Sequence, residues 1–294
     1  MSVSNLHQLG SASSRFFKLA LIALSFSVLV SADSIHAQLP TYSKSELRKE
    51  FFRGLRNERA LRTKVAEFGL GKEKTEVMLN YYSSLVRDEA VANRIFEEVA
   101  ATGIFDELER NPSAVLNDPK RAELLGYALF EMLGVRGMRR LDYQDLRVYL
   151  RSVGVLFDSL PPRVCKALIV GEISDHRELE AASSFLMKRM TLQELDSYLR
   201  VYRRAVVAEV RDFPAARELN ANQKRIADEA LMAAFMKRLN NHSRGARLAL
   251  ALADQSKASD SDFCEAGQVM ITTLLDMSGA VAEWAARGFV DSIQ

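Results

Sequence analysis

The sequence predicts an all-α protein, a multi-helix bundle or irregular helical array of about nine or ten helices after a cleaved N-terminal leader. Three observations support this. Apolar residues recur at helical spacing through most of the chain after residue 43. Breaks in that pattern coincide with Pro, Gly and Asn. The strand-like run at residues 167–170 is short and lies within a helical context.

The first 37 residues have the layout of a secretory signal peptide. Arg15 and Lys18 precede an uncharged apolar run at residues 19–30, and a polar stretch with small residues follows as far as Ala37. The apolar run is shorter than the about 20 residues that a transmembrane helix needs. We therefore expect cleavage after Ala37 and an exported protein, either periplasmic or extracellular.

Residues 38–294 are expected to form a single helical domain without a membrane-spanning segment. Two helical subdomains that meet near residues 134–137 are the alternative. The first helix, residues 43–68, begins with the capping-box pair Ser43 and Glu46. Further helices are expected at residues 72–86, 89–101, 120–133, 143–160, 176–190, 192–210, 222–239 and 263–276, with a short last helix at 280–290.

Residues 138–151 and 187–200 are similar, with seven of fourteen positions identical. An internal duplication would explain this likeness. Two similar helix starts would also explain part of it, because Asp142 and Thr191 are suitable N-caps, each followed three positions later by an acidic residue. Both explanations remain open at this point.

Composition excludes several classes of protein. The 294 residues contain 40 Lys and Arg against 38 Asp and Glu, 48% of them are hydrophobic, and two are cysteines. Balanced charge with this apolar content argues against disorder, and two cysteines are too few for a disulfide-dense scaffold or a four-cysteine zinc site. A net charge of +2 gives no general reason to expect a nucleic-acid partner.

The two cysteines, Cys165 and Cys264, are expected to form a disulfide. In an oxidising compartment a pair of cysteines tends to close. Two separate buried thiols or one catalytic thiol are the alternatives.

Signatures of catalysis are missing from the sequence. His176 and His242 remain after the leader, and neither belongs to a metal-ligand spacing. The chain has no nucleophile elbow and no phosphate-binding loop. We expect no metal, no cofactor and no catalytic residue, so a non-enzyme is favoured. Carboxylate pairs that could serve an envelope hydrolase are Glu97 with Glu98 and Glu178 with Glu180.

The first expected helix carries an excess of positive charge. Residues 44–64 include eight basic and three acidic residues, and Phe51 and Phe52 could act as apolar anchors beside them. The alternative is an ordinary core-packed helix whose basic side faces water. The predicted contact residues for a partner or an anionic surface are Lys49, Arg53, Arg56, Arg59 and Lys64.

These observations predict an exported helical binding module in the cell envelope or outside the cell. Its expected partner is another protein or the anionic envelope surface. A carrier of small molecules or lipids, with a cavity between helices, is the first alternative. A hydrolase that uses carboxylates or a free thiol is the second.

Overall fold

The fold is all-α, as the sequence predicts. The computed structural model describes residues 44–103, 105–107, 132–170, 172, 176–254 and 256–292, and these contain helices and no strand. Residues 132–138 are helical. Twelve further helices have defined bounds in the described ranges: α2 (Lys44–Leu55), α3 (Glu58–Glu67), α4 (Lys72–Arg87), α5 (Glu89–Ala101), α9 (Tyr143–Ser159), α10 (Pro162–Val170), α11 (His176–Arg189), α12 (Leu192–Val210), α13 (Ala221–Asn240), α14 (Gly245–Ala253), α15 (Asp260–Asp276) and α16 (Gly279–Ser292). The predicted leader and most of the helix expected at 120–133 lie outside the described residues.

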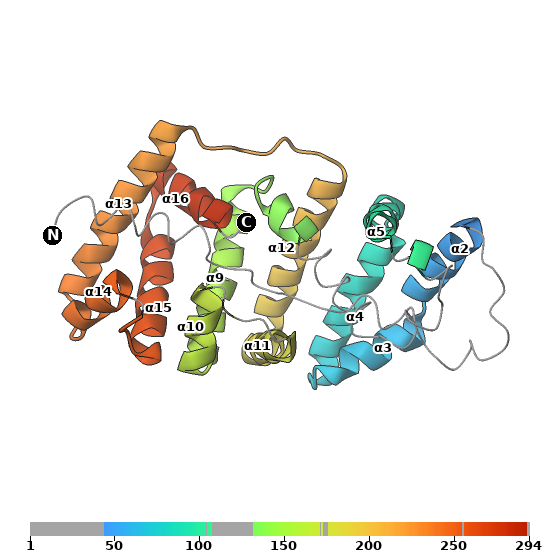
Figure 1. Cartoon of the computed structure of the whole chain (residues 1–294), viewed down its shortest axis with the longest axis horizontal. Coiled ribbons are helices and arrows are strands. Elements are labelled where there is room, and N and C mark those ends of the chain that lie inside the picture. Colours follow the sequence, from blue (N-terminus) through green and yellow to red (C-terminus); the bar gives the residue numbers. More distant parts are fainter. Residues whose placement is uncertain are drawn as a thin grey trace.

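The helices form an elongated array (Figure 1). Helices α2–α5 lie at one end, α9–α12 in the middle and α13–α16 at the other end. Helices α4 and α5 pack on α12, α12 packs on α9, and α9 packs on α15 and α16. A continuous cluster of buried apolar side chains extends from Phe51 on α2 to Val290 on α16. Each amphipathic helix therefore buries its apolar side against the next helices of the array.

The first predicted helix, residues 43–68, is two helices in the structure. Helix α2 ends at Leu55 and α3 begins at Glu58, after Asn57 as N-cap. The Asn57 side-chain oxygen accepts a hydrogen bond from the Ala60 amide at 3.1 Å. Asparagine is among the best N-caps because its oxygen satisfies an amide that has no partner within the helix. Helices α10 and α14 were not predicted, and α10 contains the strand-like run at residues 167–170.

The two similar segments begin α9 and α12, which pack against each other. Asp142 accepts a hydrogen bond from the Asp145 amide at 3.0 Å, and Thr191 accepts one from the Glu194 amide at 3.2 Å. Corresponding positions of the two helices are buried: Leu146, Tyr149 and Leu150 in α9, and Leu195, Tyr198 and Leu199 in α12. The likeness therefore extends beyond the caps to the face that each helix buries.

A layer of buried tyrosines lies where α4, α9 and α12 meet. Its members are Tyr81, Tyr82, Tyr149, Tyr198 and Tyr202. The Tyr198 side chain is completely buried, and its hydroxyl has no hydrogen-bond partner in the described part of the chain. Burial raises the pKa of this hydroxyl well above its ordinary value.

Helix 132–138 packs closely against α12 through two glycines. A Cβ added at Gly134 would lie 2.3 Å from the Tyr202 ring, and one added at Gly137 would lie 1.9 Å from the Ala205 carbonyl oxygen. Both distances are far below van der Waals contact, so this approach requires glycine. Residues 134–137, where the sequence allowed a subdomain boundary, thus form a tight helix contact.

Residues 211–220 connect α12 to α13 along the outside of the helices (Figure 1). Arg140 holds the start of this segment. Its guanidinium donates to a carboxylate oxygen of Glu209 at 2.9 Å and to the Pro214 carbonyl at 3.0 Å. The Arg217 amide donates to the Arg139 carbonyl at 3.1 Å. These bonds fix the segment against helix 132–138 and the end of α12.

Candidate functional site

Four of the five predicted basic residues have exposed side chains. We define the basic surface as the exposed side chains of Lys49, Arg53 and Arg56 on and directly after α2, together with Arg59 on α3. Phe51 and Leu55 are buried on the opposite side of α2. The spacing of four and three residues between the cations of α2 places them along one stripe.

Neighbouring cations of α3 are paired, whereas most of the basic surface is not. Arg62 donates to Glu58 and Glu76, both at 3.0 Å, and the Lys64 ammonium lies 3.0 Å from Glu67. Within the described ranges, Lys49, Arg56 and Arg59 have no acidic partner. Lys64 therefore differs from Lys49, Arg56 and Arg59 in having an ion pair, and its side chain is only 23% exposed.

The two phenylalanines do not act as protruding anchors. Phe51 is 2% exposed, and Phe52 is partly buried against the core. They belong to an aromatic cluster with Phe96 of α5 and Phe105, in which Phe52 stacks on Phe96 and Phe96 on Phe105. The expectation of apolar anchors is therefore wrong, because packing against α5 uses these rings. What the surface presents to solvent is charge.

Arg48 also belongs to this region, although the sequence reasoning did not select it. Its guanidinium lies 5.6 Å from the ring centroids of both Phe52 and Phe96 and donates to the side-chain oxygen of Asn93 at 2.7 Å. Arg56 lies 5.8 Å from the same Phe52 ring. The signal in the sequence is the spacing of these residues, since positions 48, 52 and 56 fall on one side of a helix.

The two cysteines lie together, as predicted. The sulfur atoms of Cys165 on α10 and Cys264 on α15 are at disulfide distance, 1.95 Å, and both residues are buried. A cysteine in a disulfide has no thiolate, so the catalytic-thiol alternative fails while this bond is intact.

His242, in the turn between α13 and α14, is part of a network of ion pairs. Its Nδ1 accepts a hydrogen bond from the Arg244 amide at 3.2 Å, and its Nε2 lies 3.6 Å from Glu265. Arg244 bridges Glu265 and Asp262, and Asp262 also accepts from Arg247 at 2.7 Å. The network joins the α13–α14 turn to α15, which is a structural role.

The charged form of the Asp262 carboxyl is stabilised by its hydrogen-bond partners. The hydroxyl of Ser259 donates to Asp262 and, with the Arg247 guanidinium, holds the pKa of that carboxyl below its ordinary value.

Among the carboxylates considered for a hydrolase, Glu98 is paired with Arg94 at 2.6 Å. The side chains of His176, Glu178 and Glu180 lie outside the described residues. The described residues contain no group of three metal-ligating side chains.

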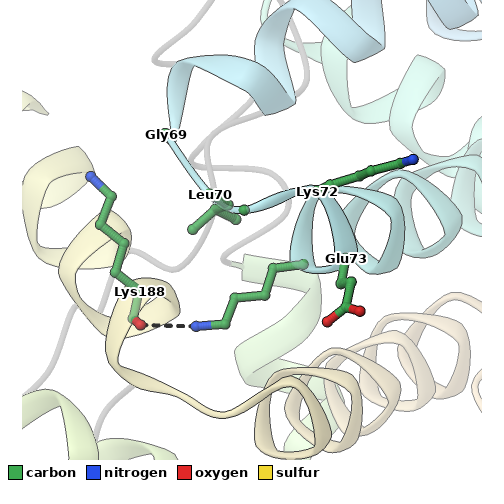
Figure 2. Close-up of a pocket in the computed structure, with 7 residues that line it drawn as sticks. Gly69, Leu70, Lys72, Glu73 and Lys188 are labelled. Carbon is green, nitrogen blue, oxygen red and sulfur yellow. Dashed lines mark hydrogen bonds between the residues drawn. The ribbon is translucent and has the colours of Figure 1, made fainter.

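A cavity of about 470 Å³ lies between the α3–α4 connection and the end of α11 (Figure 2). Three lysines line it, with Glu73 and the loop residues Gly69, Leu70 and Gly71. The Lys74 ammonium donates to the carbonyls of Met187 and Lys188 at 3.0 and 2.8 Å, so it caps the end of α11.

The lysines of this cavity do not converge on a common point. In Figure 2 the side chains of Lys72 and Lys188 extend away from each other. The cavity is also open to solvent and is lined partly by charged groups. A carrier of apolar ligands would require an enclosed apolar cavity, which this cavity is not.

No described helix combines the length and the apolar character that a membrane span needs. No protein-family model matches the chain, and neither a curated protein nor a solved structure shows a significant match to it. The basic surface of α2 and α3, with the adjacent Arg48, is therefore a candidate site on its geometry and charge alone.

Proposed function

We propose that this protein is an exported binding module that attaches to an anionic surface of the cell envelope through its basic surface. The observation that carries the proposal is the contrast within α2 and α3. Arg62 and Lys64 are paired with acids, whereas Lys49, Arg56 and Arg59 are exposed without an acidic partner in the described residues. Exposed cations without an acidic partner among the described residues are available for an external anion.

The contact we propose is peripheral and electrostatic. Because Phe51 is buried and Phe52 packs against α5, neither of these two rings is positioned to insert between lipid tails. Each basic residue close to an anionic membrane contributes about 1 kcal/mol, and this contribution is screened by salt.

Export is proposed on two grounds. The first is the signal-peptide pattern of residues 1–37, which lies outside the described residues. The second is the pair of cysteines at disulfide distance, which suits an oxidising compartment. A binding role is favoured over catalysis because the polar clusters described above form ion pairs and helix caps.

The test is co-sedimentation of residues 38–294 with vesicles of phosphatidylglycerol and phosphatidylcholine, at low and high salt. The test variant reverses three charges, Lys49→Glu, Arg56→Glu and Arg59→Glu. A matched control reverses three exposed cations on other helices, Arg151→Glu, Arg203→Glu and Lys237→Glu. Both variants change the net charge equally, so a difference between them reports the location of the contact.

We expect the test variant to bind at least about 100-fold more weakly, because three contacts of about 1 kcal/mol are lost. The control variant should keep most of the binding, and high salt should release the unmodified protein. Equal losses in the two variants would show that only net charge matters. That result, or a complete lack of vesicle binding at low salt, would overturn the proposal.

A further inference from the structure

Arg48, Phe52 and Arg56 form a stripe along α2. They lie four residues apart, and the Arg56 amide donates to the Phe52 carbonyl at 3.2 Å, so the helical path continues to Arg56. The guanidinium carbon of Arg48 lies 5.6 Å from the Phe52 ring centroid, and that of Arg56 lies 5.8 Å from it. Two guanidinium groups therefore lie within 6 Å of the centroid of one aromatic ring, and cation–π attraction holds both near it.

Arg48 is fixed by contacts with a second helix. Asn93 of α5 accepts a hydrogen bond from its Nη2 at 2.7 Å, and the Phe96 ring centroid lies 5.6 Å from its guanidinium carbon. A guanidinium has five N–H donors. Asn93 accepts a hydrogen bond from only one of the nitrogens of Arg48. The guanidinium of Arg56 has no hydrogen-bond partner in the described part of the chain. Positioned donors thus remain for an external acceptor.

The chemistry of the guanidinium selects among anions. Its planar fork donates two parallel hydrogen bonds to an oxyanion, which a lysine ammonium does not do. A phosphomonoester carries more than one negative charge and three terminal oxygens. Its oxygens are numerous enough to accept from two guanidinium groups that lie near the same ring, and the neighbouring Lys49 and Arg53 add positive charge.

We infer that Arg48 and Arg56, held against Phe52, form a binding site for a phosphomonoester group. A lipid headgroup or a free small molecule can carry such a group. The inference rests on the proposed function, since it assigns the ligand chemistry of the same region. It adds that binding there depends on the arginine side chain itself as well as on its charge.

The experiment uses the double variant Arg48→Lys/Arg56→Lys, which keeps both charges and removes both planar forks. The matched control, Arg53→Lys/Arg59→Lys, makes the same change elsewhere on the basic surface. Each protein is sedimented with phosphatidylcholine vesicles that contain either phosphatidic acid, a phosphomonoester, or phosphatidylglycerol, a phosphodiester, at equal surface charge. Calorimetric titration with inorganic phosphate tests for binding of a free group.

We expect the unmodified protein and the control to bind phosphatidic acid about tenfold more tightly than phosphatidylglycerol, and the double variant to lose this preference. Phosphate binding without vesicles would identify a free phosphate as sufficient. A preference without phosphate binding would identify the lipid headgroup as the source. Either result supports the inference if the phosphate binding, or the preference for phosphatidic acid, is absent in the double variant.

A preference that survives in the double variant, or that the control loses equally, would overturn the inference. Equal binding to both lipids together with no binding of phosphate would also overturn it, while the proposed function stands. Conversely, phosphate binding that depends on Arg48 and Arg56, in a protein that binds no vesicle, would support the inference and refute the proposed function.

Discussion

Replacement of Gly137 by alanine tests the closest helix contact in the structure. A Cβ at this position would lie 1.9 Å from the Ala205 carbonyl oxygen and 2.4 Å from its carbon. Because these are main-chain atoms of α12, they cannot rotate away, and helix 132–138 would have to move. Overpacking of this kind costs about 3 kcal/mol at the upper end of its usual range, and alanine returns about 1 kcal/mol through its helix propensity.

We therefore expect Gly137→Ala to lower the free energy of unfolding by about 2 kcal/mol. The matched control is Gly288→Ala on α16, where an added Cβ meets no atom within 4 Å. It should raise the free energy of unfolding by up to about 1 kcal/mol, since alanine is the better helix former. Urea unfolding followed by circular dichroism measures both changes.

The two substitutions should change the free energy of unfolding in opposite directions. The slope of that free energy against urea concentration should stay the same in both variants. If Gly137→Ala were as stable as the unmodified protein while Gly288→Ala was stabilised, helix 132–138 would not lie this close to α12. If Gly288→Ala were destabilised as well, the expectation that alanine stabilises a helix where its Cβ meets no other atom would be refuted.

Three further predictions concern the tyrosine layer, the cysteines and a helix cap. Tyr198→Phe should raise the free energy of unfolding by about 1 kcal/mol, because it removes a buried hydroxyl without a partner; a loss of stability in urea would reveal a missed hydrogen bond. Cys165→Ala/Cys264→Ala should lower that free energy by up to about 4.7 kcal/mol, since the cysteines close a loop with a separation of 99 residues; a reductant should destabilise the unmodified protein and leave the variant unaffected. The Thr191 amide and hydroxyl hold the pKa of Glu194 below its ordinary value of 4.5, so Glu194 contributes stability above that pH and loses it as the pH falls further. Urea unfolding across this range should show a steeper loss for the unmodified protein than for Glu194→Gln, and parallel curves would contradict the assignment.

Long amphipathic helices could be predicted from the sequence because one period governs both helix geometry and burial. Helices α9 and α12 begin where Asp142 and Thr191 predict caps, and their apolar positions are buried. The break between α2 and α3 escaped prediction because Asn57 lies in a charged stretch, and the nearby Gly54 lies within α2 and not at the break. Helix α14 is short and rich in Ala and Leu, so it offers few polar residues that would reveal a helical face.

For the candidate site, the sequence predicted the exposed cations but not the part that Arg48 plays or its contacts with α5. Lys49, Arg56 and Arg59 are exposed because they lie on the polar side of their helices. The contact of Arg48 with Asn93 could not be predicted, because it depends on which helix packs against α2. Such pairing is a property of tertiary structure, and the single-helix pattern contains no information about it.

The cysteine pair restricts the opening of some helices and leaves α2–α5 without a covalent restraint. Cys165 and Cys264 enclose α11–α14 in one covalent loop, and α2–α5 lie outside it. Contacts of α4 and α5 with α12, and the ion pair between Arg211 and Asp88, attach these helices. Local opening of α2–α5 therefore leaves the looped part folded, and amide hydrogen exchange should be faster in these helices than in α9, α12 and α15. A ligand on the basic surface would then be detected first as slower exchange in the helices that open most readily.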